Sequence, residues 1–274
     1  MRLNFQKIQG TGNDFIVVAA KDINNPKDLP LLARKLCRPH FSIGGDGLLV
    51  IGKSSAADCR MDMYNPDGTM STCGNGLRCA AIFALEQGLV KGDEFTIETQ
   101  GRTAKVKRND GNFAVNMGEP ILEARDIPVA GHSGPVIKHP FNFGGTEYEV
   151  TCVSMGNPHA VIFVDDLDYY DITQIGPLVE NSRHYFPDRA NVMLVQVKAP
   201  HEIEIKIWER GAGPTLSCGT GAMASVVAGV LTGFTERKVR VDVPGGVLDI
   251  EYPEKGGCVM SGSVEKVFEG WTEV

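Results

Sequence analysis

A loop of small residues that carries a thiol and leads into an apolar segment occurs twice in this chain of 274 residues. The first copy, residues 73–76, reads Cys-Gly-Asn-Gly, and the second, residues 218–221, reads Cys-Gly-Thr-Gly. Each is followed by an apolar segment that predicts a helix, and the two cysteines are 145 residues apart. The repeat therefore predicts two halves of similar fold, each with a helix that begins beside a cysteine.

Other residues recur at nearly the same offset over most of the chain. Their separations are 144 or 145 residues, and several of them precede an apolar strand pattern. The matched pairs are Gly12 with Gly156, Asn13 with Asn157, Asp46 with Asn191, Asn65 with Arg210, and Gly88 with Gly233. An offset this constant indicates a duplicated ancestor.

The interval between the copies is far too long for a solenoid, so each copy must form its own hydrophobic core. We predict an α/β (α+β) fold with two pseudo-symmetric domains, each a curled, mostly antiparallel sheet or barrel around a central helix. Residues 1–117 are assigned to the N-terminal half with Cys73, and residues 118–263 to the C-terminal half with Cys218. The last residues, 264–274, are expected to return to the N-terminal half.

Local patterns place several elements within these halves. A helix is predicted over 29–36, and the helix that follows Cys73 is expected to run to about Glu86 and to end at Gly88. Strands are predicted over 15–19, 48–51, 59–64, 95–99, 103–107, 113–116 and 203–208.

Charge and cysteine usage exclude several classes of protein. The formal net charge of −7 disfavours a nucleic-acid partner or an anionic membrane surface, because both select a basic face. No segment approaches the ~20 apolar residues of a membrane helix, and the first residues do not resemble a signal peptide. Seven cysteines without a Cys-x-x-Cys pair, and scattered histidines, predict reduced thiols, no metal site and a cytoplasmic location.

A cysteine at the start of a helix lies beside unpaired backbone N–H groups and the positive end of the helix dipole. Both stabilise an anion, so such a thiol can ionise below its usual pKa of about 8.5. If one cysteine removes a proton from a carbon and the other supplies a proton to the opposite face, the configuration of that carbon inverts. The matched pair, Cys73 and Cys218, therefore predicts racemase or epimerase chemistry without a cofactor.

The other cysteines are interpreted as small core residues, which is the usual role of an isolated cysteine. They are Cys37, Cys59, Cys79, Cys152 and Cys258. Loop asparagines are usually turn formers, and a lone histidine such as His159 is more often structural than catalytic. The adjacent charges Glu209 and Arg210 precede a glycine loop, and the sequence leaves open a solvated edge or a clamp for a zwitterion.

Taken together, these motifs resemble the diaminopimelate epimerase family. The resemblance is carried by segments in the family's order along the chain, namely 10–15 (GTGNDF), 65–68 (NPDG), 73–79 (CGNGLRC), 116–120 (NMGEP), 154–159 (SMGNPH), 208–213 (WERGAG) and 218–221 (CGTG). It implies a diaminopimelate epimerase-like fold of two related domains with the site in the cleft, and a homodimer. It also implies interconversion of LL- and meso-2,6-diaminopimelate without pyridoxal phosphate, in lysine and peptidoglycan precursor synthesis.

The resemblance also assigns roles to individual residues. Cys73 and Cys218 are implied to be the two acid/base residues, and His159 and Glu209 to tune their thiols. Arg210 is expected to pair with the distal carboxylate of the substrate. The substrate-binding positions implied are Asn13, Asn65, Gly74, Asn75, Asn157, Asn191, Glu209, Arg210, Gly219 and Thr220.

Three positions depart from the family pattern. Gly47 stands where some members have a substrate-binding glutamine, so that contact is expected to be absent or made by the backbone. Pro214 and Ser217 stand where an acidic residue and an alanine are common, which predicts a different local loop shape.

Three other functions remain open at this point. A proline or hydroxyproline racemase shares the two-cysteine logic, although it would not need a charged clamp such as Glu209 and Arg210. A phosphate- or nucleotide-binding module would use the glycine loops, but neither loop is followed by Lys-Ser or Lys-Thr. A redox dithiol is the third, and oxidation is expected to join Cys73 to Cys218 as an inactivating side reaction.

Overall fold

The computed structural model describes residues 2–109 and 111–274, which divide into two compact units. Unit 1 comprises Met1–Asn116 with Ser261–Val274, and unit 2 comprises Met117–Met260. Among the described residues, none of the helices has the length and apolar character that crossing a lipid bilayer requires.

Unit 1 contains nine strands and two α-helices among its described residues. The strands are β1 (Arg2–Gly10), β2 (Asn13–Ala19), β3 (Gly47–Gly52), β4 (Cys59–Tyr64), β5 (Met70–Ser71), β6 (Glu94–Thr99), β7 (Arg102–Asn109), β8 (Asn112–Asn116) and β18 (Glu265–Glu273). The α-helices are α1 (Leu29–Leu36) and α2 (Gly74–Glu86), and short 3-10 turns lie at Ala20–Asp22 and Pro26–Asp28.

The strands of unit 1 pair in the order β18, β1, β2, β3, β4, β6, β7, β8, and β5 pairs with β4. The pairs β2–β3 and β4–β6 are parallel, and the remaining pairs are antiparallel. The C-terminal strand β18 pairs antiparallel with the N-terminal strand β1, so both ends of the chain belong to this unit.

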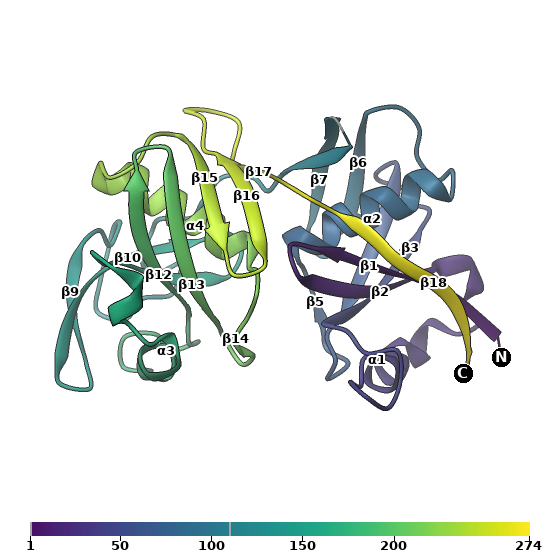
Figure 1. The fold of residues 1–274 in the computed structure, drawn as a ribbon, viewed down its shortest axis with the longest axis horizontal. Coiled ribbons are helices and arrows are strands. Elements are labelled where there is room, and N and C mark those ends of the chain that lie inside the picture. The colour runs from purple at the N-terminus through teal and green to yellow at the C-terminus, as the bar shows by residue number, and fades with distance from the viewer. Residues whose placement is uncertain (1, 110) are drawn as a thin grey trace. The chain divides into compact units, whose positions relative to one another are not determined.

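Helix α2 lies inside the curl of this sheet and packs against β1, β2, β3, β4 and β8 (Figure 1). Ten of its 13 residues are buried, among them Leu77, Ala80 and Phe83. A helix that is buried on most sides has no face in contact with water and therefore carries few polar residues. This explains the weak amphipathic pattern of the segment that follows Cys73.

Unit 2 repeats these elements. Its strands are β9 (His139–Phe143), β10 (Thr146–Ser154), β11 (Pro158–Phe163), β12 (Asn191–Ala199), β13 (Glu202–Glu209), β14 (Gly213–Pro214), β15 (Lys238–Val243) and β16 (Gly246–Glu251), while β17 (Val259–Gly262) runs across the boundary between the units. Its helices are α3 (Ile172–Glu180) and α4 (Gly219–Thr232), with a 3-10 turn at Leu167–Tyr169.

The strand order of unit 2 is β9, β10, β11, β12, β13, β15, β16, and β14 pairs with β13. The pairs β11–β12 and β13–β15 are parallel, at the same places as in unit 1. Helix α4 packs against β10, β11, β12, β15 and β16, as α2 does in its own sheet. Each unit is therefore a mostly antiparallel curled sheet around a central helix, as the sequence predicts.

The register of the strands corrects two of the matched pairs. Phe15 lies opposite Gly47 in unit 1, and His159 lies opposite Asn191 in unit 2. Both positions are shifted by 144 residues, so Asn191 corresponds to Gly47 and not to Asp46.

The same offset of 144 holds at the following hairpin, because Tyr64 pairs with Met70 and Trp208 pairs with Pro214. Asn65 therefore corresponds to Glu209 and not to Arg210. The offset of 145 at the cysteines arises because the second unit has one extra residue between this hairpin and its cysteine. The match of Asn65 with Arg210, which uses the offset of the cysteines, is wrong for that reason.

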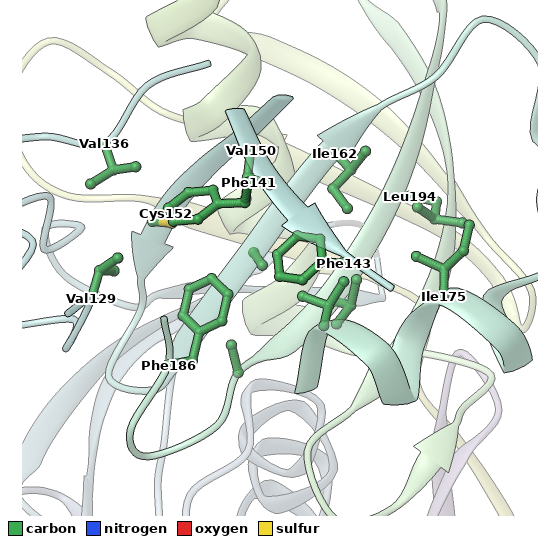
Figure 2. Close-up of a cluster of buried hydrophobic side chains, with 14 of the residues drawn as sticks. Val129, Val136, Phe141, Phe143, Val150, Cys152, Ile162, Ile175, Phe186 and Leu194 are labelled. Atoms are coloured by element: carbon green, nitrogen blue, oxygen red, sulfur yellow. The ribbon is translucent and has the colours of Figure 1, made fainter. Parts of the chain in front are cut away.

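One hydrophobic cluster of unit 2, in which α3 packs against the sheet, is rich in aromatic residues (Figure 2). Phe141 and Phe143 of β9 pack against each other and against the fully buried Phe186. Val150 of β10 and Ile162 of β11 belong to the same cluster. Helix α3 adds Ile175 and Val179 to this core, and a proline at 177 lies inside the helix. This cluster anchors α3, whose C-terminal residue matters for the site described below.

Most of the elements expected from periodicity are present, with α1 and β4 at the expected bounds. Strand β1 and helix α3 were not expected. The sequence of β1 alternates polar and apolar residues over 2–6, a strand signal that the expectations above left out, whereas α3 contains both a glycine and a proline, which normally disfavour a helix.

Candidate functional site

Each repeated cysteine is the N-cap residue of the central helix of its unit. Cys73 has extended backbone angles (φ −143°, ψ 129°), and the N–H of Leu77 donates to its carbonyl oxygen at 3.1 Å. Cys218 has similar angles (φ −130°, ψ 103°), and the N–H of Ala222 donates to its carbonyl at 2.9 Å. Both thiols therefore lie where the helix N–H groups and dipole stabilise negative charge.

In unit 1, three of the expected site residues meet at one amide oxygen. The Sγ of Cys73 donates to Oδ1 of Asn13 at 3.4 Å, and Nδ2 of Asn75 donates to the same oxygen at 3.4 Å. Nδ2 of Asn13 in turn donates to Oδ2 of Asp46 at 2.6 Å, which fixes the orientation of the Asn13 amide. The residue next to the cysteine, Gly74, is buried as the first residue of α2.

Asn65 is the first residue of the loop 65–69, which joins β4 to β5. Its Nδ2 donates to Oγ1 of Thr69 at 3.0 Å, and its backbone N–H donates to the carbonyl of the same residue at 2.8 Å. The Nε of Arg34, on α1, donates to the carbonyl oxygen of Asp67 at 2.6 Å and ties this loop to the helix.

In unit 2, the thiol of Cys218 has a different neighbour. Its Sγ lies 3.4 Å from Oγ1 of Thr220, the position that corresponds to Asn75 in unit 1. Gly219 is buried as the first residue of α4. Gly221 gives the sulfur room, since a Cβ there would lie 2.6 Å from Sδ of Met193 and 3.3 Å from Sγ of Cys218.

His159 is completely buried on β11 and is held by Asn157, whose Oδ1 lies 3.0 Å from its Nε2. An amide oxygen accepts, so Nε2 carries the proton and Nδ1 is left as an acceptor. Among the described residues Nδ1 has no hydrogen-bond partner. Burial, helped by the positive charge of Arg210, lowers the pKa of His159 to about 3, so the imidazole is neutral at pH 7.

Asn191, Glu209 and Arg210 form the other polar group of unit 2. Asn191 donates from Nδ2 to the carbonyl of Pro158 at 2.9 Å, and its Oδ1 accepts from the backbone N–H of Arg210 at 2.9 Å. Oε1 of Glu209 accepts from the hydroxyl of Thr215 at 2.7 Å. The Arg210 side chain is exposed and donates to the carbonyl of Asp188 at 2.8 Å.

The loop that carries Glu209 and Arg210 is held from behind by Glu180, a residue that the sequence analysis missed. Glu180 is 4% exposed at the end of α3. Its carboxylate accepts from the backbone N–H of Gly211 at 2.9 Å, from Nε1 of Trp208 at 2.7 Å and from Arg189 at 2.9 Å. A glutamate at the end of an irregular helix gives no signal in a single sequence.

The departure at Gly47 has a steric explanation. A Cβ at this position would lie 3.0 Å from the carbonyl oxygen of Tyr64 and 3.3 Å from the ring of Phe15. A side chain at this position would crowd both neighbours, and as a glycine residue 47 can contact a ligand only through main-chain atoms.

The five remaining cysteines are core residues, as expected from the sequence. Their thiols are free and buried, and burial raises their pKa values, to about 12 for Cys37, Cys152 and Cys258 and about 11 for Cys59. The pKa of Cys79 is also raised by burial. Cys73 and Cys218 differ from these five in standing at the N-terminus of a helix, where the first N–H groups and the helix dipole stabilise a thiolate.

Comparison with known proteins identifies the family. The family model described as "Diaminopimelate epimerase" matches residues 5–123 and 151–267. The chain belongs to the diaminopimelate epimerase family. The diaminopimelate epimerase of Pelotomaculum thermopropionicum is 46% identical over 282 residues, with 98% of each chain covered. That of Desulforudis audaxviator is 45% identical over 274 residues, with 98% of each chain covered.

Solved structures show how far the fold of the diaminopimelate epimerase family extends. A phenazine biosynthesis protein of the PhzF family from Bacillus anthracis superposes with a TM-score of 0.73 at 15% identity, over 100% of both chains. A hydroxyproline epimerase from Agrobacterium vitis gives a TM-score of 0.70 at 14% identity, over 98% of this chain and 92% of that one. At such low identity these likenesses establish the fold alone.

Proposed function

We propose that this protein is a cofactor-independent epimerase that interconverts LL- and meso-2,6-diaminopimelate, a reaction of lysine and peptidoglycan precursor biosynthesis. The observation that carries the proposal is the matched pair of helix N-caps, Cys73 and Cys218, each with its thiol beside the first N–H groups of a buried helix. Membership of the diaminopimelate epimerase family supplies the substrate class.

The proposed step is a proton transfer across one carbon. One cysteine acts as a thiolate and removes the α-proton, so that the C–H bond breaks and its electron pair enters an enediolate on the adjacent carboxylate. The other cysteine, as a thiol, gives its proton to the opposite face, which forms the new C–H bond and leaves a thiolate. No electron is gained or lost overall, and the reverse reaction exchanges the two roles.

The proposed carboxylate cradle consists of the residues that follow each cysteine. Gly74 and Asn75 begin α2, and Gly219 and Thr220 begin α4, so their backbone N–H groups belong to the first turn of a helix, which has no acceptors for them within the helix itself. These donors suit both a bound carboxylate and the charge that develops on it in the transition state. The proposal assigns the reacting end of the substrate to these residues.

The distal end of the substrate is assigned to the polar loops. Arg210 has an exposed guanidinium suited to a carboxylate, and Glu209 carries a charge that complements an ammonium group. The remaining proposed contacts are Asn13, Asn65, Asn157 and Asn191. His159 and Glu209 are proposed to tune the thiols, with His159 acting as a neutral imidazole.

The decisive experiment supplies LL-2,6-diaminopimelate in D2O without pyridoxal phosphate and follows the product by NMR and mass spectrometry. Deuterium is expected at one α-carbon, with no loss of activity on treatment with hydroxylamine. Cys73→Ser and Cys218→Ser are each expected to lower kcat by about 10²–10⁴-fold, because each removes one acid/base group. Racemisation of proline without turnover of diaminopimelate would overturn the proposal.

A second test asks whether the two sulfur atoms approach one substrate carbon. Treatment of the resting protein with diamide is expected to form a Cys73–Cys218 disulfide, with loss of activity that dithiothreitol restores. Peptide mapping locates the bond, and the buried Cys152 is the internal control that should stay reduced. Full activity under oxidant, with both thiols free, would contradict a shared site.

We also propose a homodimer that forms through β18. Val267, Phe268 and Trp271 of this strand are 54%, 47% and 53% exposed, which is unusual for three large apolar side chains within one strand. Sedimentation velocity should give a dimer for the natural protein and a monomer for Trp271→Glu. A monomer of the natural protein would contradict this assignment.

We also propose a cytoplasmic location, because the seven cysteines are thiols and not disulfides.

A further inference from the structure

Helix α2 carries one charged side chain, Arg78, that is completely buried. Its NH2 atom donates to Oγ1 of Thr11 at 3.3 Å, and a Cβ on Gly10 would lie 3.1 Å from the same atom. Among the described residues, Nε and NH1 have no hydrogen-bond partner, and no carboxylate forms an ion pair with this guanidinium. Arginine stays protonated in proteins, so a positive charge is enclosed here without a conventional counterion.

The position of Arg78 relates it to the catalytic end of the helix. It follows the N-cap Cys73 by five residues, and side chains on a helix point back toward its N-terminus. The guanidinium accordingly reaches the turn at Thr11, two residues before Asn13, and the amide oxygen of Asn13 accepts from the Cys73 thiol. The buried guanidinium and the Cys73 thiol therefore both hydrogen-bond to the segment 11–13.

Two thiols lie within electrostatic range of Arg78, namely Cys79 and Cys73. Cys79 is completely buried, and burial raises its pKa, so it stays protonated at neutral pH. Cys73 is only partly buried and stands at the helix N-terminus, where a thiolate is stabilised. Of the two, Cys73 is the group that can supply the missing negative charge.

The second unit lacks this arrangement. The residue that corresponds to Arg78 on α4, at the offset of the cysteines, is Met223, and the residue before Gly156 is Met155 where unit 1 has Thr11. Both methionines are buried. The duplication has thus kept a thiol at each helix start and a buried cation behind only one of them.

We propose that Arg78 is a positioning residue that holds Cys73 as the thiolate of the resting enzyme, while Cys218 rests as the thiol. This inference rests on the proposed function. In the resting form Cys73 then accepts the α-proton and Cys218 donates, so the isomer that presents its α-hydrogen to Cys73 is processed first. After one turnover the proton is on Cys73, and the charge has moved to Cys218 until a proton exchanges with solvent.

Other charges around Cys73 modify this preference. Arg102 on β7 is a second cation within electrostatic range of the Cys73 sulfur. Asp14 on β2 is an anion close to Cys79 and is paired with Nζ of Lys7 at 2.6 Å, and Asp46 accepts from Asn13. Arg78 is the group among these that is both fully buried and without an anionic partner, which makes its charge the least screened.

The test measures the ionisation of both cysteines in the same protein, without substrate. Alkylation by iodoacetamide at pH 5–10 is quantified by peptide mapping, and the pH midpoint of each rate reports the thiolate, independently of how accessible the sulfur is. In the natural protein the midpoint for Cys73 should lie below that for Cys218. A lower midpoint for Cys218 would overturn the inference whatever any variant does.

The matched variants are Arg78→Met, which copies unit 2, and Arg78→Lys, which keeps the charge. Arg78→Met should raise the Cys73 midpoint by about one pH unit, with a roughly tenfold lower thiolate fraction at neutral pH, and leave Cys218 unchanged. Arg78→Lys should stay near the natural value, and Met223→Leu is the control on α4. An unchanged Cys73 midpoint in folded Arg78→Met would overturn the inference.

Two further readouts separate this role from a merely structural one. In Arg78→Met the acidic limb of the pH profile of kcat/KM should move up with the Cys73 midpoint, while thermal stability is retained or increased, because a charge whose burial costs free energy is replaced by an apolar side chain. A structural role would lower stability and leave the pH profile in place. Because alkylation uses no substrate, a low Cys73 midpoint without deuterium exchange would refute the proposed reaction and leave this inference intact.

Discussion

The two helix N-termini have similar backbone angles at the cysteine, but different side chains contact the two sulfur atoms. Cys73 donates to Asn13, which is fixed by Asp46, whereas Cys218 lies against Thr220, and the corresponding Asn157 holds His159 instead. Strand order, parallel pairs and helix placement are the same in both units. Duplication has therefore preserved the frame that places a thiol at a helix start, while the surrounding side chains have diverged.

The loops that follow β4 and β13 differ in the same way. In unit 1 the loop is held by an arginine on α1, since Arg34 donates to the carbonyl of Asp67. In unit 2 the equivalent loop is held by a buried carboxylate on α3, Glu180, which accepts from Gly211. The position of the support is conserved although its charge is reversed.

The largest expected effect is on stability and comes from removing the buried carboxylate of Glu180, which supports the loop of unit 2. Glu180→Ala leaves the Gly211 N–H, the Trp208 indole and Arg189 without their acceptor, and should lower the free energy of unfolding of unit 2 by about 3 kcal/mol. The matched change in unit 1, Arg34→Ala, removes one exposed hydrogen bond and should cost about 1 kcal/mol.

Urea unfolding measures both changes, since Trp208 lies in unit 2 and Trp271 in unit 1 and each is the tryptophan of its own unit. Trp208 fluorescence should shift to a lower midpoint in Glu180→Ala, whereas Trp271 fluorescence should report the smaller effect of Arg34→Ala. Equal losses in the two variants would show that the buried carboxylate is no more important than the exposed arginine.

The next effect is a pH dependence of stability that arises in unit 2 from His159. Its counterpart in unit 1 is Phe15, which does not titrate. The folded-state pKa of His159, about 3, lies below the unfolded value of about 6.5, so folding favours the neutral form. The resulting stability is present above pH 6.5 and is lost as the pH falls toward 3.

At pH 5 the loss at this one site should be about 2 kcal/mol relative to pH 7. His159→Gln keeps a side-chain N–H for Asn157 but cannot titrate, so its stability should fall less steeply between pH 6.5 and 4. Urea titrations of both proteins across this range provide the measurement. Parallel pH curves for the two proteins would mean that His159 is not the buried neutral group described above.

The smallest expected effect is on stability and compares the two helix starts at the second glycine of each motif, Gly76 and Gly221. A Cβ on Gly76 would make ordinary contacts, 3.4 Å from Cβ of Cys73 and 3.5 Å from Leu49, whereas a Cβ on Gly221 would overlap Met193. Gly221→Ala should cost about 1–2 kcal/mol as Met193 is displaced. Gly76→Ala should be neutral or stabilising by up to about 1 kcal/mol, because alanine favours a helix.

Thermal unfolding of the two glycine variants provides the comparison, and kcat measured on the same samples shows whether the Cys218 sulfur has moved. A stable, fully active Gly221→Ala would mean that Met193 yields freely and that the second helix start is as tolerant as the first.

Much of the fold and the framework of the site could be predicted from the sequence. The duplicated Cys-Gly-x-Gly motif located both central helices, and the β4 and α1 patterns gave their bounds. Asn13, Asn75 and Cys73 were expected to lie together, and they share one amide oxygen. The register was the weak point, because one extra residue before Cys218 shifts the helix repeat against the strand repeat and misaligns Asn65 and Asp46.

The residues that the sequence missed are those whose role depends on enclosure. Glu180 is a structural acceptor because α3 packs on an aromatic core that buries its end. Arg78 had one usable signal, since it is the single charge in the first turns of a helix that otherwise lacks a polar face. Such a helix must be buried on all sides, and an arginine within it is buried too.

By itself, then, the sequence determined that the chain is doubled and that a thiol stands at the start of each central helix, because periodicity and glycine placement are local properties of the chain. Only the tertiary structure decided which polar groups surround each sulfur. Burial and charge compensation depend on strands far away in sequence, and they make Arg78 an enclosed cation in one unit where Met223 is an ordinary core residue in the other.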